Sequence, residues 1–93
     1  MPVTHDPDQS RFVLELWGTD EAFLLDQPLE ADGQVAFTSV FVPDTHRGQG
    51  LAAQLADAAF QHARAAGWSV HPVCPYLRTA YLPRNPQHAD VLA

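Results

Sequence analysis

The stretch FVPDTHRGQGLA, residues 41–52, joins an apolar segment to a long helical one, and it determines how the rest of the chain is arranged. Pro43 ends the apolar run, and an Arg-Gly-Gln-Gly turn follows it. Glycines at 48 and 50 allow the backbone to turn tightly and to approach a ligand closely. The free amides at the start of a helix, and its partial charge of about +0.5, favour an anion there. Taken alone, these residues fit either an anion-binding turn or an ordinary helix start.

The sequence after this turn predicts an amphipathic helix over residues 51–66, LAAQLADAAFQHARAA. At about 100° per residue, Leu51, Leu55 and Phe60 fall on one face together with several alanines, while polar residues fall on the other. Gly67 is the residue type that most often ends a helix. We therefore expect a helix whose alanine-rich face packs closely on the core.

Three strands are predicted before the turn. Residues 12–17 alternate apolar side chains on one face, and residues 21–26 and 34–42 are also rich in strand formers. Turn chemistry separates them at residues 18–20 and at Ala31-Asp32-Gly33, where Asp-Gly tolerates the positive φ of a hairpin. The expected arrangement is three sequential antiparallel strands.

Residues 68–73 predict a fourth strand after the helix. A strand-helix-strand crossover of this length places the two strands parallel and in a right-handed connection. Residues 76–82 fit about two helical turns before Pro83, and a loop with a short terminal turn or helix follows. The polar, acidic residues 1–10 predict a flexible N-terminus, so the expected fold is one α/β domain over residues 11–93.

Composition limits the classes of function. The chain has 93 residues and a formal net charge of -6, with five arginines and no lysine, which argues against a nucleic-acid surface and favours basic partners. Cys74 is the only cysteine, so an internal disulfide is excluded. No signal peptide and no run of about 18 apolar residues is evident, so we expect a cytoplasmic protein without a membrane partner. No metal site is expected, because the five histidines lack ligand spacing.

Two motifs in the right order point to a family. Arg47-x-x-Gly50-x-Ala52, after Phe41-Val42-Pro43, resembles the acetyl-CoA signature of GNAT acetyltransferases. The tail PVCPYLRTAYLPRNPQHADVLA, residues 72–93, is similar to that of a short branch of this superfamily with a Cys-Pro-Tyr motif. The resemblance extends over about residues 11–91 and implies a minimal GNAT fold.

This resemblance also implies how the cofactor acetyl-CoA would bind. The third and fourth strands would splay apart, with pantetheine in the gap beside the main chain of Phe41 and Val42. The pyrophosphate would lie on the amides of the turn and the first helical residues, namely Arg47, Gly48, Gln49, Gly50, Leu51 and Ala52. CoA would be the product.

Three residues are candidates for the chemistry. The resemblance places Cys74 near the thioester, where it is either a nucleophile or a buried side chain that lines the channel. Tyr81 lies at a plausible position to protonate the departing thiolate, or it packs its ring on the sheet. Many relatives carry a histidine where this chain has Ser39, so base catalysis from that strand is in doubt. His71, on the neighbouring strand, is a substitute candidate.

The function expected from these residues is an acetyl-CoA-dependent N-acetyltransferase that uses direct attack by the amine of an unidentified acceptor, a small molecule or a polypeptide. The alternative is a non-catalytic module on the same fold, which binds CoA or a protein partner. The shortness of the chain favours this alternative, because it leaves little room for a built acceptor pocket.

Overall fold

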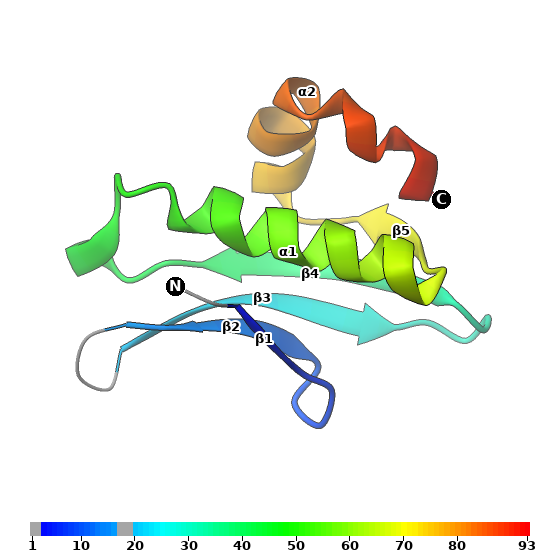
Figure 1. Cartoon of the computed structure of the whole chain (residues 1–93), viewed down its shortest axis with the longest axis horizontal. Coiled ribbons are helices and arrows are strands. Elements are labelled where there is room, and N and C mark those ends of the chain that lie inside the picture. Colours follow the sequence, from blue (N-terminus) through cyan, green and yellow to red (C-terminus); the bar gives the residue numbers. More distant parts are fainter. Residues whose placement is uncertain (1–2, 17–19) are drawn as a thin grey trace.

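The computed structural model describes residues 3–16 and 20–93. A five-stranded sheet in the order β1-β2-β3-β4-β5 is covered on one face by a long helix, α1, and a C-terminal helical segment packs beside that helix (Figure 1). The strands are β1 Thr4–Asp6, β2 Arg11–Glu15, β3 Glu21–Pro28, β4 Gln34–Phe41 and β5 Ser69–Pro72. The helices are η1 Asp44–His46, α1 Leu51–Ala66, η2 Leu77–Tyr81, α2 Leu82–Arg84 and η3 Pro86–Val91.

The sheet is mixed, as expected. Strands β1 to β4 pair in antiparallel fashion, and β5 lies parallel to β4 after the crossover through α1. The three predicted hairpin strands correspond to β2, β3 and β4. The expected turn at residues 18–20 lies mostly outside the described residues. The mixed α/β prediction, with its short C-terminal helix, is confirmed.

The N-terminus differs from the expectation. Residues 4–6 form the edge strand β1 rather than a flexible terminus, and His5 pairs with Phe12 of β2 in register. The His5 ring stacks on the ring of Phe12 at 4.3 Å between centroids, and its Nε2 lies 2.9 Å from Oδ2 of the buried Asp26. The prediction for residues 1–10 is therefore wrong for residues 4–6, because one histidine supplies both an aromatic and a polar anchor in an otherwise polar stretch.

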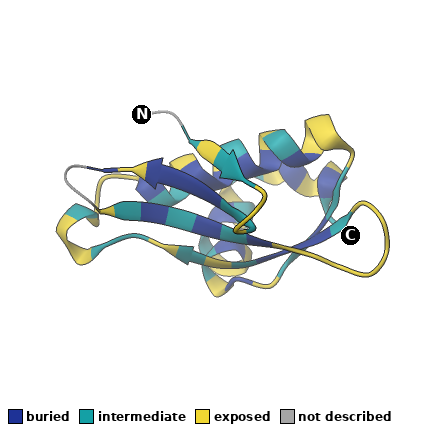
Figure 2. Ribbon diagram, turned by 90° about the horizontal axis from the view of Figure 1, so that it is seen from below, coloured by how far each residue is buried: buried dark blue, intermediate teal, exposed yellow. Residues whose placement is uncertain are grey.

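Helix α1 has the predicted bounds. Buried and exposed residues recur in turn along the helix (Figure 2), and its buried residues belong to the hydrophobic core. These buried residues are Leu51, Leu55, Ala56, Ala59, Phe60 and Ala63. Gly50 and Gly67 flank the helix with left-handed φ values of 73° and 74°. The small alanines let the helix approach the sheet, where Phe60 packs edge-on against Phe37 of β4 at 5.2 Å.

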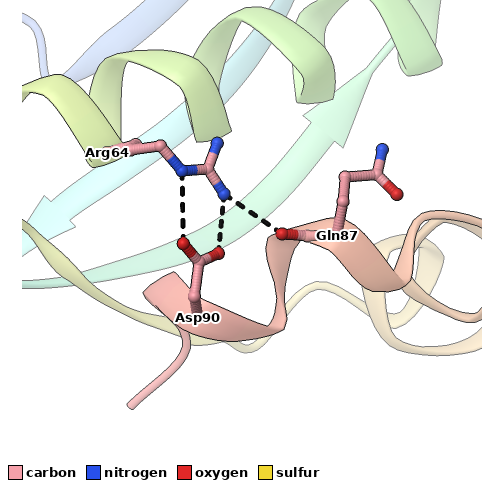
Figure 3. A network of polar contacts seen from close by, with 3 residues as sticks. All are labelled: Arg64, Gln87 and Asp90. Carbon is pink, nitrogen blue, oxygen red and sulfur yellow. Dashed lines mark hydrogen bonds and ion pairs between the residues drawn. The ribbon is translucent and has the colours of Figure 1, made fainter.

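The C-terminal segment is helical over residues 75–84 and includes a five-residue π-helix, η2, before α2 and η3. It returns to the sheet, where Leu92 bridges to Val70 of β5. Arg64 of α1 holds its far end: the guanidinium donates to Asp90 at 2.6 Å and to the Gln87 carbonyl at 3.1 Å (Figure 3). In the described parts of the chain, none of the helices combines the length and apolar character needed to cross a bilayer.

Candidate functional site

The strands β4 and β5 separate part-way along their length. Their parallel pairing runs from Gln34 opposite Ser69 to Phe37 opposite Pro72. The Phe37 carbonyl then accepts the amides of Val73 and Cys74, both at 3.0 Å. Beyond this point β4 continues to Phe41 along β3 alone, within the residues that the structure describes.

A bulge accompanies the separation. On β3, Leu25 lies opposite Ser39 and Asp26 lies opposite Phe37, so Thr38 is an extra residue on β4. A bulge of this kind bends the strand and increases its twist. The end of β4 is thereby directed away from β5.

A cleft of about 620 Å³ opens beside the end of β4. One wall comes from β4, a second from the glycine turn and the first turn of α1, and a third from the C-terminal helical segment. The lining residues are Val40, Val42, His46, Arg47, Gly48, Gly50, Leu51, Ala52, Ala53, Tyr76 and Arg84. Apolar side chains from β4 therefore face a polar, glycine-rich turn across one open space.

The turn has the geometry of an anion cradle. Gly48 and Gly50 have φ values of +83° and +73°, and a Cβ built on either would meet no heavy atom within 4 Å. Glycine is needed there for its backbone conformation and not for lack of space. The first backbone bond of α1 runs from the Gln54 amide to the Gly50 carbonyl, so the amides of residues 51–53 precede it. No acidic residue lies in the first turn of the helix.

Positive charge gathers at this cleft although the protein carries a net charge of -6. Arg47 and Arg84 both line it, as does His46. Arg47 Nε lies 3.1 Å from Asp44 Oδ1, so the exposed side chain is folded back on η1. Two of the five arginines are thus placed beside a helix N-terminus, which suits a group with several phosphates.

A comparison with known families identifies the fold. A family model described as GCN5-related N-acetyl-transferase matches residues 11–91 of the 93-residue chain. The chain belongs to this family. GCN5-related N-acetyltransferases transfer acyl groups, and acetyl-CoA is the donor that the family generally uses. The residues of the cleft fit such a donor, because glycine-turn amides and arginines suit its phosphates and the β4 valines suit its apolar arm.

Most of the residues predicted to bind the cofactor lie at the cleft. Val42, Arg47, Gly48, Gly50, Leu51 and Ala52 line it. Gln49 is exposed and lies outside the lining set. Phe41 stacks on Phe23 at 5.2 Å between centroids, and the alternation along β4 directs its side chain to the opposite face from that of Val40 and Val42. Phe41 is outside the set of residues that line the cleft, so its predicted main-chain contact with the cofactor stays a prediction.

Five residues that line the cleft were not predicted from the sequence. Val40 could have been found, because it has the same strand parity as Val42. Ala53 continues the first helical turn, and His46 precedes Arg47 directly. Tyr76 and Arg84 left no local signal, since their position depends on how the C-terminal segment packs against α1.

Cys74 is buried, with 4% of its surface exposed, and lies where β4 and β5 separate. Its amide donates to the Phe37 carbonyl at 3.0 Å, so the backbone at Cys74 is fixed. Its side chain is outside the set that lines the cleft in the described chain. This location is compatible with both interpretations of the thiol, as a nucleophile and as a packed side chain.

Tyr81 is buried, and its hydroxyl donates to Oδ1 of Asp57 at 2.5 Å. Burial, and then the neighbouring Asp57 carboxylate, raise the pKa of Tyr81 above its ordinary value. Tyr76, in contrast, lines the cleft itself. Burial and the charge of Asp57 raise the pKa of Tyr76, whereas the nearby Arg84 guanidinium acts in the opposite direction. Of the two tyrosines, only Tyr76 lies in the lining of the cleft, whereas Tyr81 was the predicted proton donor.

The predicted substitute base, His71, lies apart from the cleft lining, and so does Ser39, the residue that stands where many relatives have a histidine. His71 Nε2 is 2.7 Å from Oε1 of Gln34, and this pair lies on the β4–β5 part of the sheet. Ser39 is exposed opposite Leu25. Neither residue is among those that line the cleft.

Proposed function

We propose that this chain binds acetyl-CoA in the cleft and transfers its acetyl group to the amine of an acceptor. The observation that carries the proposal is the cleft itself, which lies beside the end of β4 and is lined by the glycine turn and the first turn of α1. Membership of the GCN5-related N-acetyltransferase family supports the reaction class.

The binding arrangement follows from the chemistry of the lining residues. Amides of the turn and of residues 51–53 suit the pyrophosphate, and Arg47 and Arg84 add charge beside it. Val40 and Val42 present an apolar surface to the pantetheine arm. Within the described residues, the pairing of β4 with β5 ends at Phe37, which leaves the main chain of β4 after that residue to pair with the amide groups of that arm.

The proposed reaction is direct attack. The neutral amine adds to the thioester carbonyl, the carbon–sulfur bond breaks, and the departing thiolate takes a proton. We assign that proton to the hydroxyl of Tyr76, a residue that lines the cleft, and keep Tyr81 as the alternative. We assign the proton lost by the amine to solvent. His71 lies outside the residues that line the cleft, and His46, which does line it, directly precedes Arg47 in the turn that we assign to the pyrophosphate.

The proposed acceptor is cationic before it reacts. Eleven acidic residues against five basic ones give the protein a negative average field, which attracts an ammonium group. An alkyl ammonium has a pKa near 10.4 and must lose a proton before it attacks, so we expect the rate to rise toward alkaline pH.

Turnover with a panel of amines tests the proposal. The protein is incubated with acetyl-CoA and spermidine, a lysine peptide, or neutral and acidic amines, and acetylated products are measured by mass spectrometry at low and high salt. We expect acetylation of cationic amines that salt weakens. A protein that binds acetyl-CoA but acetylates none of these amines would contradict the enzyme assignment and favour the non-catalytic module.

A further inference from the structure

Two polar contacts connect α1 to the C-terminal helical segment. At the end away from the cleft, Arg64 holds Asp90 and Gln87 (Figure 3). Near the cleft, Asp57 accepts a hydrogen bond from the Tyr81 hydroxyl. Asp57 lies one helical turn after Ala53, which lines the cleft. The second contact therefore connects α1 to the wall of the cleft that the C-terminal helical segment forms.

The wall held by this contact carries two cleft residues. Tyr81 lies between Tyr76 and Arg84 in the continuous helical segment 75–84. Its ring is buried in the core, where it packs against the rings of Phe60 at 5.7 Å and His88 at 5.8 Å between centroids. The Tyr81 ring thus anchors the helical segment in the core. The hydrogen bond from its hydroxyl to Asp57 fixes the orientation of the segment and its position along α1.

We propose that Asp57 is a positioning residue for acetyl transfer, which holds the wall that presents the Tyr76 hydroxyl to the cleft through its hydrogen bond with Tyr81. The inference rests on the proposed function, because it assumes that Tyr76 gives its proton to the departing thiolate. Asp57 itself points to Tyr81 and is outside the residues that line the cleft in the described chain.

The charge of Asp57 has a second consequence for Tyr76. The groups that act on Tyr76 are Asp57 from α1, Arg84 from α2 and Cys74 from the residues before the helix, with Tyr81 beside it in η2. After burial, Asp57 is the largest of the causes that raise the pKa of Tyr76, and Arg84 lowers it. A proton donor must be protonated, so a higher pKa extends activity to higher pH. Loss of the Asp57 charge must lower this pKa and move the alkaline limb of the rate profile to lower pH.

The chain has two tyrosines, so single variants isolate each one. In the Tyr81→Phe background, the ultraviolet absorbance of tyrosinate reports Tyr76 alone. Adding Asp57→Asn should lower the midpoint of this titration, and adding Arg84→Gln should raise it. Arg64→Gln, which breaks the other contact, is the matched control and should leave the midpoint unchanged. A midpoint that Asp57→Asn leaves in place or raises would overturn the inference.

Steady-state kinetics tests the hydrogen bond. Asp57→Ala and Tyr81→Phe should each lower kcat about tenfold, the rate equivalent of one net hydrogen bond, while the far-UV spectrum stays that of the folded protein. Asp57→Asn keeps an acceptor oxygen and should retain most of kcat, but with its alkaline limb at lower pH. Arg64→Gln should keep the wild-type rate. Equal losses in Arg64→Gln and Asp57→Ala would mean general destabilisation and contradict the positioning role.

The two proposals fail in different ways. The tyrosine titration needs no acetyl-CoA, so it measures the effect of Asp57 on Tyr76 even in a protein without turnover. Wild-type protein that acetylates no amine contradicts the proposed function. Wild-type turnover with a rate profile that Asp57→Asn leaves unchanged contradicts the role of Asp57 alone.

Discussion

The backbone of Cys74 is held by its hydrogen bond to Phe37, and the residue is buried at the point where β4 and β5 separate. A buried thiol of this kind is more typical of packing than of nucleophilic attack, which needs an accessible thiolate. We therefore predict that Cys74→Ala lowers kcat/KM by about tenfold or less, the size of effect expected for a small change in cleft shape.

A covalent relay through Cys74 predicts a different result. Loss of an obligatory nucleophile removes several orders of magnitude of rate. The wild-type protein mixed with acetyl-CoA alone would also gain one acetyl mass on the peptide that carries residue 74. Observation of that adduct at a rate that matches turnover would refute direct attack.

The sequence predicted the residues of the glycine turn because their role is local. Gly48 and Gly50 must adopt positive φ, and the helix that follows needs no distant contact to place its amides. Local sequence could not show in the same way whether Tyr76 or Tyr81 lines the cleft. They are five residues apart in a segment with π-helical hydrogen bonds, so the usual period of 3.6 residues does not say which of them faces the cleft.

Helix α1 ends on Gly67, whose φ of +74° lies in the left-handed region. A Cβ there would meet no heavy atom within 4 Å, so the cost of a side chain comes from the backbone alone. We predict that Gly67→Ala lowers the free energy of unfolding by about 1 kcal/mol, as measured by urea denaturation. An unchanged free energy would show that the helix ends equally well without the left-handed residue.

At the scale of elements, α1 was predicted with its bounds because its apolar period and its two flanking glycines agree. Strand β1 was not predicted. Its three residues are only partly buried, and they depend on contacts of His5 with Phe12 of β2 and Asp26 of β3. The bulge at Thr38 also left no local signal. It arises from the register between β3 and β4, which single-sequence patterns do not fix.

His88 couples the C-terminal segment to the stability of the whole molecule. It is buried, its ring stacks on Phe60 at 4.9 Å, and its Nδ1 has no hydrogen-bond partner among the described residues. Burial, and then the charge of Arg64, lower the pKa of His88. The unfolded chain then binds the proton more tightly than the folded one, so His88 costs stability as the pH falls below about 6.5.

We predict that His88→Phe, which keeps a stacked ring but does not titrate, reduces the loss of stability between neutral and mildly acidic pH. His62, whose pKa is also lowered by burial, still titrates in the variant, so part of the loss remains. Urea denaturation of both proteins over this pH range measures the difference. A wild-type protein that loses no more stability than the variant would contradict the account of His88.

Calorimetric titration of the folded protein tests the proposal that acetyl-CoA binds on the glycine turn at the start of α1. Gly50→Val places a β-branched side chain at a φ of +73° within the cleft. Gly67→Val places the same side chain at a φ of +74° at the other end of the helix. We predict that the wild type and folded Gly67→Val bind acetyl-CoA and that folded Gly50→Val does not. Wild-type affinity in Gly50→Val, or no binding by the wild type, would contradict the proposal.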